Sequence, residues 1–310
     1  RFGTAKWSLG ADTYARLVAA ALAGPFLPRP DDRVGSEDGR LAAPAKIDFV
    51  TARKEFYKRP TALPDVEPGS IKLDLHRRDF TINTLAVRLD GAFLGQLLDF
   101  YGGRRDLRRG IIRVLHSLSF VDDPTRILRA VRLEQRLGFT IEPGTAELID
   151  DALPMLDRVT GERIRNEIEL ALREADPVRV MERLDGLGVL DHLAPGLSWQ
   201  PETAAAFERI PLFADDPLWG ETYRASSPVF FFFAVWLAPF AAPVPELVAR
   251  RLRVRKATLE DLLGLGDLRV ALASLANDAP PSVVVRTLNR FAPRTLLTVR
   301  MLDLSSRANE

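Results

Sequence analysis

The sequence predicts an α+β protein in which a small domain with a mixed β-sheet precedes a long all-helical region. Up to about residue 100, apolar and polar residues alternate in short runs at 1–9, 47–53 and 86–93, which is the periodicity of a half-buried strand. From about residue 120 onward, apolar residues recur every three or four positions, as in an amphipathic helix. The two parts of the chain are therefore expected to differ in structural class.

Helices are expected in both parts. In the first part they are predicted at 14–23 and 80–85, and the stretch 25–44, rich in Pro, Gly and charge, is predicted to be a long loop. In the second part, helices are predicted at 124–137, 144–152, 160–174 and 177–187. Gly138 is expected to end the first of these, because glycine readily adopts the left-handed conformation that closes many helices.

The most apolar run of the chain, 229–240, contains four consecutive phenylalanines. It is shorter than the about 20 residues that a membrane-spanning helix needs. We therefore expect a buried core helix. An exposed aromatic platform on which nucleic-acid bases could stack is the alternative.

Composition narrows the kinds of site that the chain can hold. The chain has no cysteine, which excludes disulfides and thiolate metal sites and is compatible with a cytoplasmic location. The three histidines, His76, His116 and His192, are scattered singly, which argues against a zinc site and predicts surface or packing roles. The net charge is only +1, yet residues 101–136 hold nine arginines and four acidic residues, a local excess that suits phosphate groups.

Asp123 and Arg126 stand three residues apart at the start of the helix predicted over 124–137. A carboxylate only accepts hydrogen bonds and a guanidinium only donates them, so the two can pair with a base edge that offers an amino group beside a ring nitrogen. Cytosine and adenine present that edge, whereas guanine and uracil do not. The alternative is that Asp123 serves as an ordinary helix cap before Pro124.

A second polar group, Arg78, Asp79 and Asn83, lies at the start of the helix predicted over 80–85. Arg78 and the positive end of a helix could hold a triphosphate, and Asp79 and Asn83, four residues apart, could bind ribose hydroxyls. A capped helix with a solvated charged end is the alternative. Between the two groups, Gly102 and Gly103 predict a turn or a hinge.

Two arginine-rich stretches could contact RNA phosphates. Arg129, Arg132 and Arg136 fall on one face of the helix predicted over 124–137. The run 250–256 holds a further basic cluster. For both, a solvated helix face is the alternative.

Three segments, in order, resemble motifs B, C and D of the class II tRNA nucleotidyltransferase and poly(A) polymerase family. The family forms are RRDFTIN, DxxGGxxDLxxGxIR and EDxxRxLRAxRF, and the matching segments here are 77–83, 99–113 and 122–133. The last motif has Asp122 where the family usually has Glu. Residues 162–167 also resemble the family's ERIRxE element.

The resemblance implies a template-independent enzyme that adds CMP or AMP to the 3′ end of tRNA, with the tRNA end, CTP and ATP as partners and no DNA or membrane partner. By position it assigns ribose and triphosphate to Arg78, Asp79 and Asn83, the base to Asp123 and Arg126, and a hinge to Gly102 and Gly103. It also places Asp48 at the position of a catalytic carboxylate that binds Mg²⁺.

The resemblance further implies three domains: a partial palm domain at 1–100, a helical neck that recognises the base at 101–190, and a helical body and tail that bind tRNA at 191–310. The family's GGxVRD loop and its Asp-x-Asp pair have no counterpart, and residues 1–7 resemble the strand that follows that pair. We therefore expect a fragment of a longer protein that is inactive by itself.

The nucleotides that the parent protein adds are left open. Addition of CCA, of CC, of A alone, and poly(A) synthesis all fit the base-reading pair. A different class of function is also open, in which a non-catalytic protein binds RNA or senses nucleotides.

Overall fold

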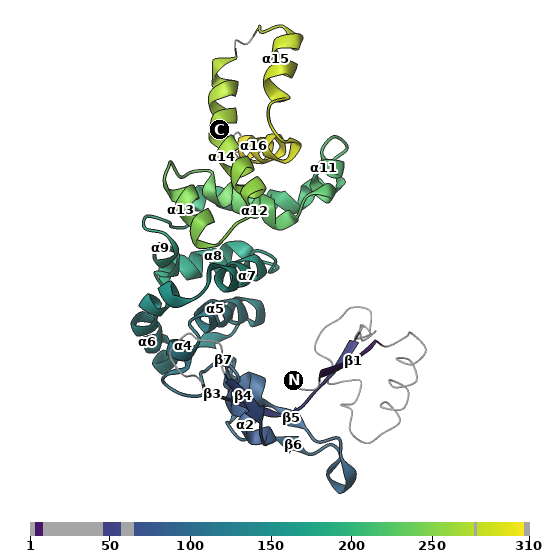
Figure 1. The fold of residues 1–310 in the computed structure, drawn as a ribbon, viewed down its shortest axis with the longest axis vertical. Coiled ribbons are helices and arrows are strands. Elements are labelled where there is room, and N and C mark those ends of the chain that lie inside the picture. Colours follow the sequence, from purple (N-terminus) through teal and green to yellow (C-terminus); the bar gives the residue numbers. More distant parts are fainter. Residues whose placement is uncertain (1–3, 9–45, 57–64, 276–277, 307–310) are drawn as a thin grey trace. The chain divides into compact units, whose positions relative to one another are not determined.

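The computed structural model describes residues 4–8, 46–56, 65–275 and 278–306 (Figure 1). The chain divides into two compact units, one composed of residues 1–58 and 63–105 and the other of residues 59–62 and 106–310. The first unit carries most of the described strands and the second almost all of the described helices, which confirms the predicted α+β class. The helix predicted at 14–23 and the loop at 25–44 lie outside the described residues.

Short antiparallel strand pairs form the described part of the first unit, where they are separate two-stranded sheets and do not join into one mixed sheet. The run predicted at 86–93 holds only a two-residue strand, because Gly91 takes a positive φ of 43° and the chain turns back into a hairpin. The pairs are β1 (Thr4–Ser8) with β2 (Lys46–Val50), β3 (Arg53–Phe56) with β4 (Asp65–Pro68), and β5 (Ala86–Val87) with β6 (Leu97–Leu98).

The helical turns of the first unit differ from the prediction. A helix that the pattern did not predict, α2 (Ile71–His76), begins where the Ser70 hydroxyl accepts a hydrogen bond from the backbone N–H of Leu73 at 3.4 Å. The helix predicted at 80–85 is wrong, since this stretch forms the 3₁₀ turn η2 (Thr81–Thr84). The Thr84 hydroxyl donates to the Thr81 carbonyl at 2.7 Å, a local bond that competes with regular helix. The 3₁₀ turn η3 (Gly91–Phe93) and helix α3 (Gly103–Arg109) follow.

The second unit begins with helices whose predicted positions are confirmed within a few residues. Gly138 ends α5 with φ 63°, as expected for a left-handed closing residue. Helices α5, α7 and α8 pack against one another around a buried apolar core (Figure 1). In order the elements are β7 (Ile111–Ile112), α4 (Ser119–Asp122), α5 (Thr125–Leu137), β8 (Thr140–Ile141), α6 (Pro143–Ala152), η4 (Leu153–Arg158), α7 (Gly161–Ala171), α8 (Pro177–Gly186) and α9 (Val189–Leu193).

One short strand pair interrupts the helical pattern: β7 pairs with β8 in parallel. Two-residue strands leave too few alternating positions for a sequence pattern to reveal them. The expectation that the chain is helical throughout after residue 120 is wrong at this point.

The remaining helices of the second unit are built around the phenylalanine run. Every residue of this run from Phe230 to Phe233 is buried inside α12, which confirms the core helix and excludes an exposed aromatic platform. No helix in the described part of the chain has both the length and the apolar character of a membrane span. The elements are η5 (Pro201–Thr203), α10 (Ala204–Arg209), η6 (Ile210–Asp215), α11 (Gly220–Ala225), α12 (Pro228–Leu237), α13 (Val244–Arg251), α14 (Lys256–Ser274), α15 (Pro281–Leu288) and α16 (Pro293–Ser306).

Candidate functional site

Asp79 and Asn83 lie together on either side of the start of η2. The Asp79 carboxylate accepts hydrogen bonds from the backbone N–H of Phe80 at 3.0 Å and from the side-chain amide of Asn83 at 2.8 Å. The four-residue spacing thus brings the two side chains together, although the turn between them is 3₁₀ and not α-helical. The pair presents hydrogen-bonding atoms of the kind that a ribose hydroxyl needs.

Arg78 lies just beyond the carboxyl end of α2, and not at the amino end of a helix. The carboxyl end of α2 carries the negative end of the helix dipole, so α2 does not supply the positive helix end expected beside Arg78. Binding of a triphosphate by Arg78 stays a prediction. Arg78 donates to Asp74 at 3.4 Å and its side chain is 46% exposed, so its guanidinium can still reach a ligand.

Asp74 organises this arginine pair, a role that the sequence analysis missed. Its carboxylate accepts bonds from the backbone N–H of Arg53 at 3.1 Å and from Arg77 at 2.9 Å. Burial raises the pKa of Asp74, but the hydrogen bonds from Arg77 and Arg53 and the charges of Arg77 and Arg78 outweigh burial and hold its pKa below the ordinary value. The available signal was the acid three and four positions before two arginines.

The glycine pair has a clear local role. Gly102 takes a φ of 75°, and a Cβ on Gly103 would lie 2.2 Å from the Thr81 carbonyl oxygen, so both positions favour glycine. Asp99 accepts from the backbone N–H groups of Gly103 at 2.8 Å and Arg104 at 3.1 Å, which caps the start of α3. The boundary between the two units falls inside α3, after residue 105. Hinge motion at these glycines stays a prediction.

In the second unit, Asp123 joins the start of α5 to α7. Its Oδ1 accepts from the backbone N–H of Thr125 at 3.1 Å, the Thr125 hydroxyl at 2.6 Å and the Arg163 guanidinium at 2.8 Å. The cap-like contact with Thr125 is therefore real. Because all three bonds use Oδ1 and no described residue bonds to Oδ2, capping leaves an oxygen for a ligand. Arg163 belongs to the segment that resembles the ERIRxE element.

Arg126 is nearly buried, with 5% of its surface exposed. Its Nη1 donates to the Ser119 hydroxyl at 2.6 Å and approaches the Ser119 carbonyl at 3.5 Å. These bonds fix the guanidinium near the α4–α5 turn, beside the segment that carries Asp123. Base reading by this pair stays a prediction.

The arginine face of α5 meets α7 and the residues just after it through a partly buried ion-pair network. Arg129 and Arg132 bind Glu167 at 3.0 and 2.6 Å, and Arg132 binds Glu174 at 3.0 Å. Arg136, on the more exposed side, binds Glu174 as well. Arg132 is 8% exposed, so in this structure it stabilises the contact between helices. The predicted contact with RNA is untested for all three, and Arg136 is the most exposed of them.

The predicted metal ligand, Asp48, lies in β2 opposite Lys6 of β1. The structure describes the backbone of Asp48 but not its side chain. No group of three or more histidine, aspartate or glutamate side chains that could hold a metal occurs among the described residues. A lone carboxylate is a chemically suitable Mg²⁺ donor but does not complete a site.

The single histidines have structural neighbours. Nδ1 of His192 lies 3.0 Å from the Gly188 carbonyl, and the ring of His76 lies 5.5 Å from that of Tyr101. Both contacts agree with the predicted packing roles.

Two family models match the chain. One, described as the poly A polymerase head domain, matches residues 33–113. The other, described as the probable RNA and SrmB-binding site of polymerase A, matches residues 138–200. The first match includes the residues of the polar group at 78–83, and the second begins directly after α5.

Curated proteins and solved structures are also similar to this chain. An A-adding tRNA nucleotidyltransferase of Geobacter sulfurreducens is 50% identical over 167 residues, covering 53% of this chain and 19% of the relative. One of Halalkalibacterium halodurans is 40% identical, covering 65% of this chain and 48% of the relative. A Thermotoga maritima CCA-adding enzyme, solved in complex with tRNA, is 36% identical with a TM-score of 0.61, covering 75% of this chain and 56% of that one. The chain thus spans less than half the length of the two curated relatives.

Proposed function

This chain belongs to the class II tRNA nucleotidyltransferase and poly(A) polymerase family, and we propose that the protein of which it is part adds nucleotides to the 3′ end of tRNA without a template. The observation that carries the proposal is the arrangement of Asp123 and Arg126 at the α4–α5 turn. Asp123 offers an oxygen to which no described residue bonds, and the guanidinium of Arg126 is held at the same turn. We expect the two together to complement the base edge of cytosine or adenine.

Residues 78–83 of the first unit carry groups of the kind that bind the sugar and the phosphates of a nucleotide. Asp79 and Asn83 would bind the ribose, and Arg78 the triphosphate, from positions beside one another in the chain. Asp48 would be one ligand of Mg²⁺. Further carboxylate ligands would be needed, and the described residues contain no group that could supply them. The bound ion would activate the 3′-hydroxyl of tRNA and stabilise the leaving pyrophosphate.

Addition of A is the favoured subtype, because both curated relatives described above are named A-adding enzymes. The substrate would then be ATP and a tRNA that already ends in CC. CTP is the substrate if the parent protein instead adds CC or the full CCA sequence. We place the reaction in the cytoplasm.

The test is incorporation of labelled ATP and CTP, separately and together with Mg²⁺, into tRNA that ends before CCA and into tRNA that ends in CC. The parent protein at its natural length is the enzyme to use, with this 310-residue chain alongside it. Addition of a single A to the tRNA that ends in CC would support the A-adding subtype. Addition of C to the tRNA that ends before CCA would instead indicate a CC-adding or CCA-adding enzyme. A long A tail would indicate poly(A) synthesis. If the parent protein bound tRNA but incorporated no nucleotide, the proposed enzymatic activity would be contradicted and a non-catalytic RNA-binding function would be favoured.

A further inference from the structure

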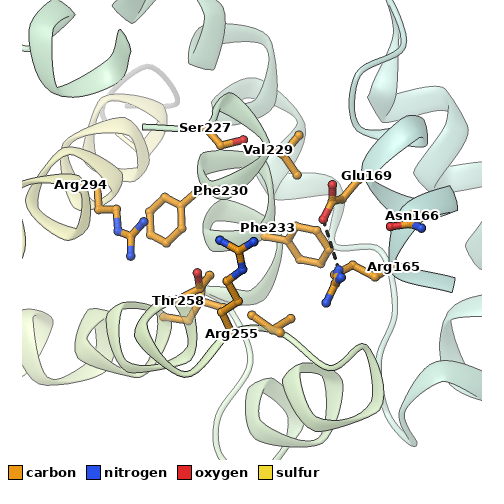
Figure 2. A pocket seen from close by; sticks show the side chains of 12 residues that line it. Arg165, Asn166, Glu169, Ser227, Val229, Phe230, Phe233, Arg255, Thr258 and Arg294 are labelled. Atoms are coloured by element: carbon orange, nitrogen blue, oxygen red, sulfur yellow. Dashed lines mark ion pairs between the residues drawn. The ribbon is translucent and has the colours of Figure 1, made fainter. Parts of the chain in front are cut away.

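A cavity of about 410 Å³ lies in the helical unit among α7, α12, α14 and α16 (Figure 2). Its volume falls within the range of small-molecule sites, about 300–1,000 Å³. Neither Asp123 nor Arg126 lines it, so it is not part of the base-reading site. Its lining combines arginine side chains and hydroxyl groups with two phenylalanine rings.

Two of the lining arginines are held in place by neighbouring residues. Arg165 donates to the Leu252 carbonyl at 3.2 Å and pairs with Glu169 at 3.4 Å. Arg294 donates to Asp261 at 2.6 Å, and its guanidinium lies 4.5 Å from the centre of the Phe230 ring. These contacts fix two positive groups at the rim of the cavity.

Arg255 differs from these two arginines. No described residue forms a hydrogen bond or an ion pair with its side chain, although the neighbouring Arg253 pairs with Glu162 at 2.8 Å. Figure 2 shows its guanidinium extending into the cavity beside the ring of Phe233. Among the cavity's charged side chains the three arginines face one carboxylate, Glu169, so the cavity carries excess positive charge.

The first turns of two helices add to this positive field. Ser227, at the amino end of α12, and Arg255, at the amino end of α14, both line the cavity, and neither makes a side-chain cap. The uncapped N–H groups and the positive end of the 19-residue α14 favour an anion. The arginines and the helix ends therefore select the same kind of ligand.

The opposite wall suits a flat ring. Phe230 and Phe233 are only 5% and 7% exposed, so they form no open platform, but both rings line the cavity, where a bound base can contact them. Asn166, Ser227 and Thr258 supply hydrogen-bonding atoms around the wall. We propose that this cavity binds one nucleotide unit, with its phosphate on Arg255 and its base against Phe233, as a second nucleotide site separate from Asp123 and Arg126. The unit could be a free nucleoside phosphate or one nucleotide of an RNA strand.

Binding of adenosine monophosphate and of a hexa-adenylate strand to the full 310-residue chain tests the proposal. A background of Asp123→Asn with Asp79→Ala weakens both the proposed base contact and the proposed ribose contact, so that the further loss caused by a cavity variant reports the cavity. Arg255→Ala should weaken binding of whichever probe occupies the cavity by about tenfold or more, the loss expected for a charge-assisted bond. Adenosine, which lacks the phosphate, should bind at least about tenfold more weakly than its monophosphate.

Arg250→Ala is the matched control. Arg250 is an exposed arginine in the same basic run, without a described partner, and it does not line the cavity. This variant should bind within about twofold of the parent chain, because a charge outside the site contributes only screened attraction. Ser227→Asp gives an independent check, since aspartate caps helices well but places a negative charge at the cavity. It should keep the thermal midpoint and lose the binding.

If adenosine monophosphate binds more strongly than the hexa-adenylate strand, the ligand is a free nucleotide. If only the strand binds, the ligand is RNA. The proposal is overturned if neither probe binds, if Arg255→Ala leaves affinity unchanged, or if Arg250→Ala and Arg255→Ala reduce it equally. The readout is binding, so loss of nucleotide incorporation by the parent protein would not affect the result.

Discussion

Arg163 of α7 donates a hydrogen bond of 2.8 Å to the carboxylate of Asp123, which stands 40 positions earlier in the chain. Asp123 is the acceptor half of the proposed base-reading pair, so a residue of the next long helix sets its orientation. The bond also joins the segment resembling motif D to the one resembling ERIRxE. The base-reading site therefore depends on the packing of α7 against α5 as well as on its own residues.

Arg163→Ala in the parent protein is expected to reduce kcat/KM for the nucleotide by about tenfold while leaving affinity for tRNA unchanged. Thr125 would still hold Oδ1 of Asp123, but the carboxylate would lose its charged partner. Arg163→Lys should restore part of the loss. Arg173→Ala, which removes an exposed pair with Glu169, is the control and should have no effect. Equal losses for both variants would contradict the positioning role.

Glu174→Gln tests the ion-pair network between α5 and the residues that follow α7. Burial raises the pKa of Glu174, but hydrogen bonds from Arg136 and Arg132 outweigh burial and hold it below the ordinary 4.5. At pH 7 the variant should be about 2 kcal/mol less stable to urea. Glu182→Gln, at an exposed glutamate without a described partner, should change little.

The same lowered pKa predicts how this contribution depends on pH. The stability that Glu174 provides is fully present above the pKa of the unfolded chain and is lost as pH falls through the lower pKa of the folded chain. As pH falls below the ordinary value of 4.5, the stability of Glu174→Gln should therefore fall less steeply than that of the parent chain. Parallel curves for the two proteins would contradict this assignment.

Gly103→Ala tests the close approach at the start of α3. The new Cβ would lie 2.2 Å from the Thr81 carbonyl oxygen, so backbone must move, and we expect a loss of about 3 kcal/mol in thermal unfolding. Gly266→Ala, in the interior of α14 with nothing within 4 Å, is the control. It should gain up to about 1 kcal/mol from helix propensity. Equal midpoints for the two variants would show that the chain relaxes freely around Gly103.

Local signals in the sequence predict much of the helical unit. Asp123, which precedes Pro124, and Gly138 mark the two ends of α5 in the sequence. These signals can be read locally because helix caps and left-handed closing residues depend only on neighbouring residues. Residues 80–85 are misread because their apolar pattern fits a helix, while the Thr84 hydroxyl bonds to the Thr81 carbonyl and favours a 3₁₀ turn.

Tertiary partners are what the sequence pattern lacks. The helical spacing correctly places Arg129, Arg132 and Arg136 on one face, but it carries no information on what that face meets. The partners, Glu167 and Glu174, stand 35 or more positions away. The same holds for the contact of Arg163 with Asp123 and for the cavity around Arg255.

Asp79→Ala in the parent protein should weaken binding of ATP and CTP alike, by about tenfold. Asp79 is proposed to contact the ribose, which the two nucleotides share, and its loss also frees the Asn83 amide. Equilibrium binding of each nucleotide is the measurement. A change in the preference between ATP and CTP would contradict the assignment of Asp79 to the sugar.

Arg126→Ala should relax the choice of base, because it removes the donor half of the pair. The parent protein should then incorporate UTP or GTP at a measurable rate into tRNA, with tRNA affinity nearly unchanged. Arg126 is nearly buried and bonded to Ser119, so the substitution also creates a cavity and is expected to lower stability by about 2 kcal/mol.

Ser119→Ala separates the two effects, since it removes the same bond but keeps the guanidinium. If Ser119→Ala relaxes selectivity as much as Arg126→Ala does, the orientation of Arg126 and not its mere presence decides the base. If neither variant alters the preference, Arg126 does not read the base.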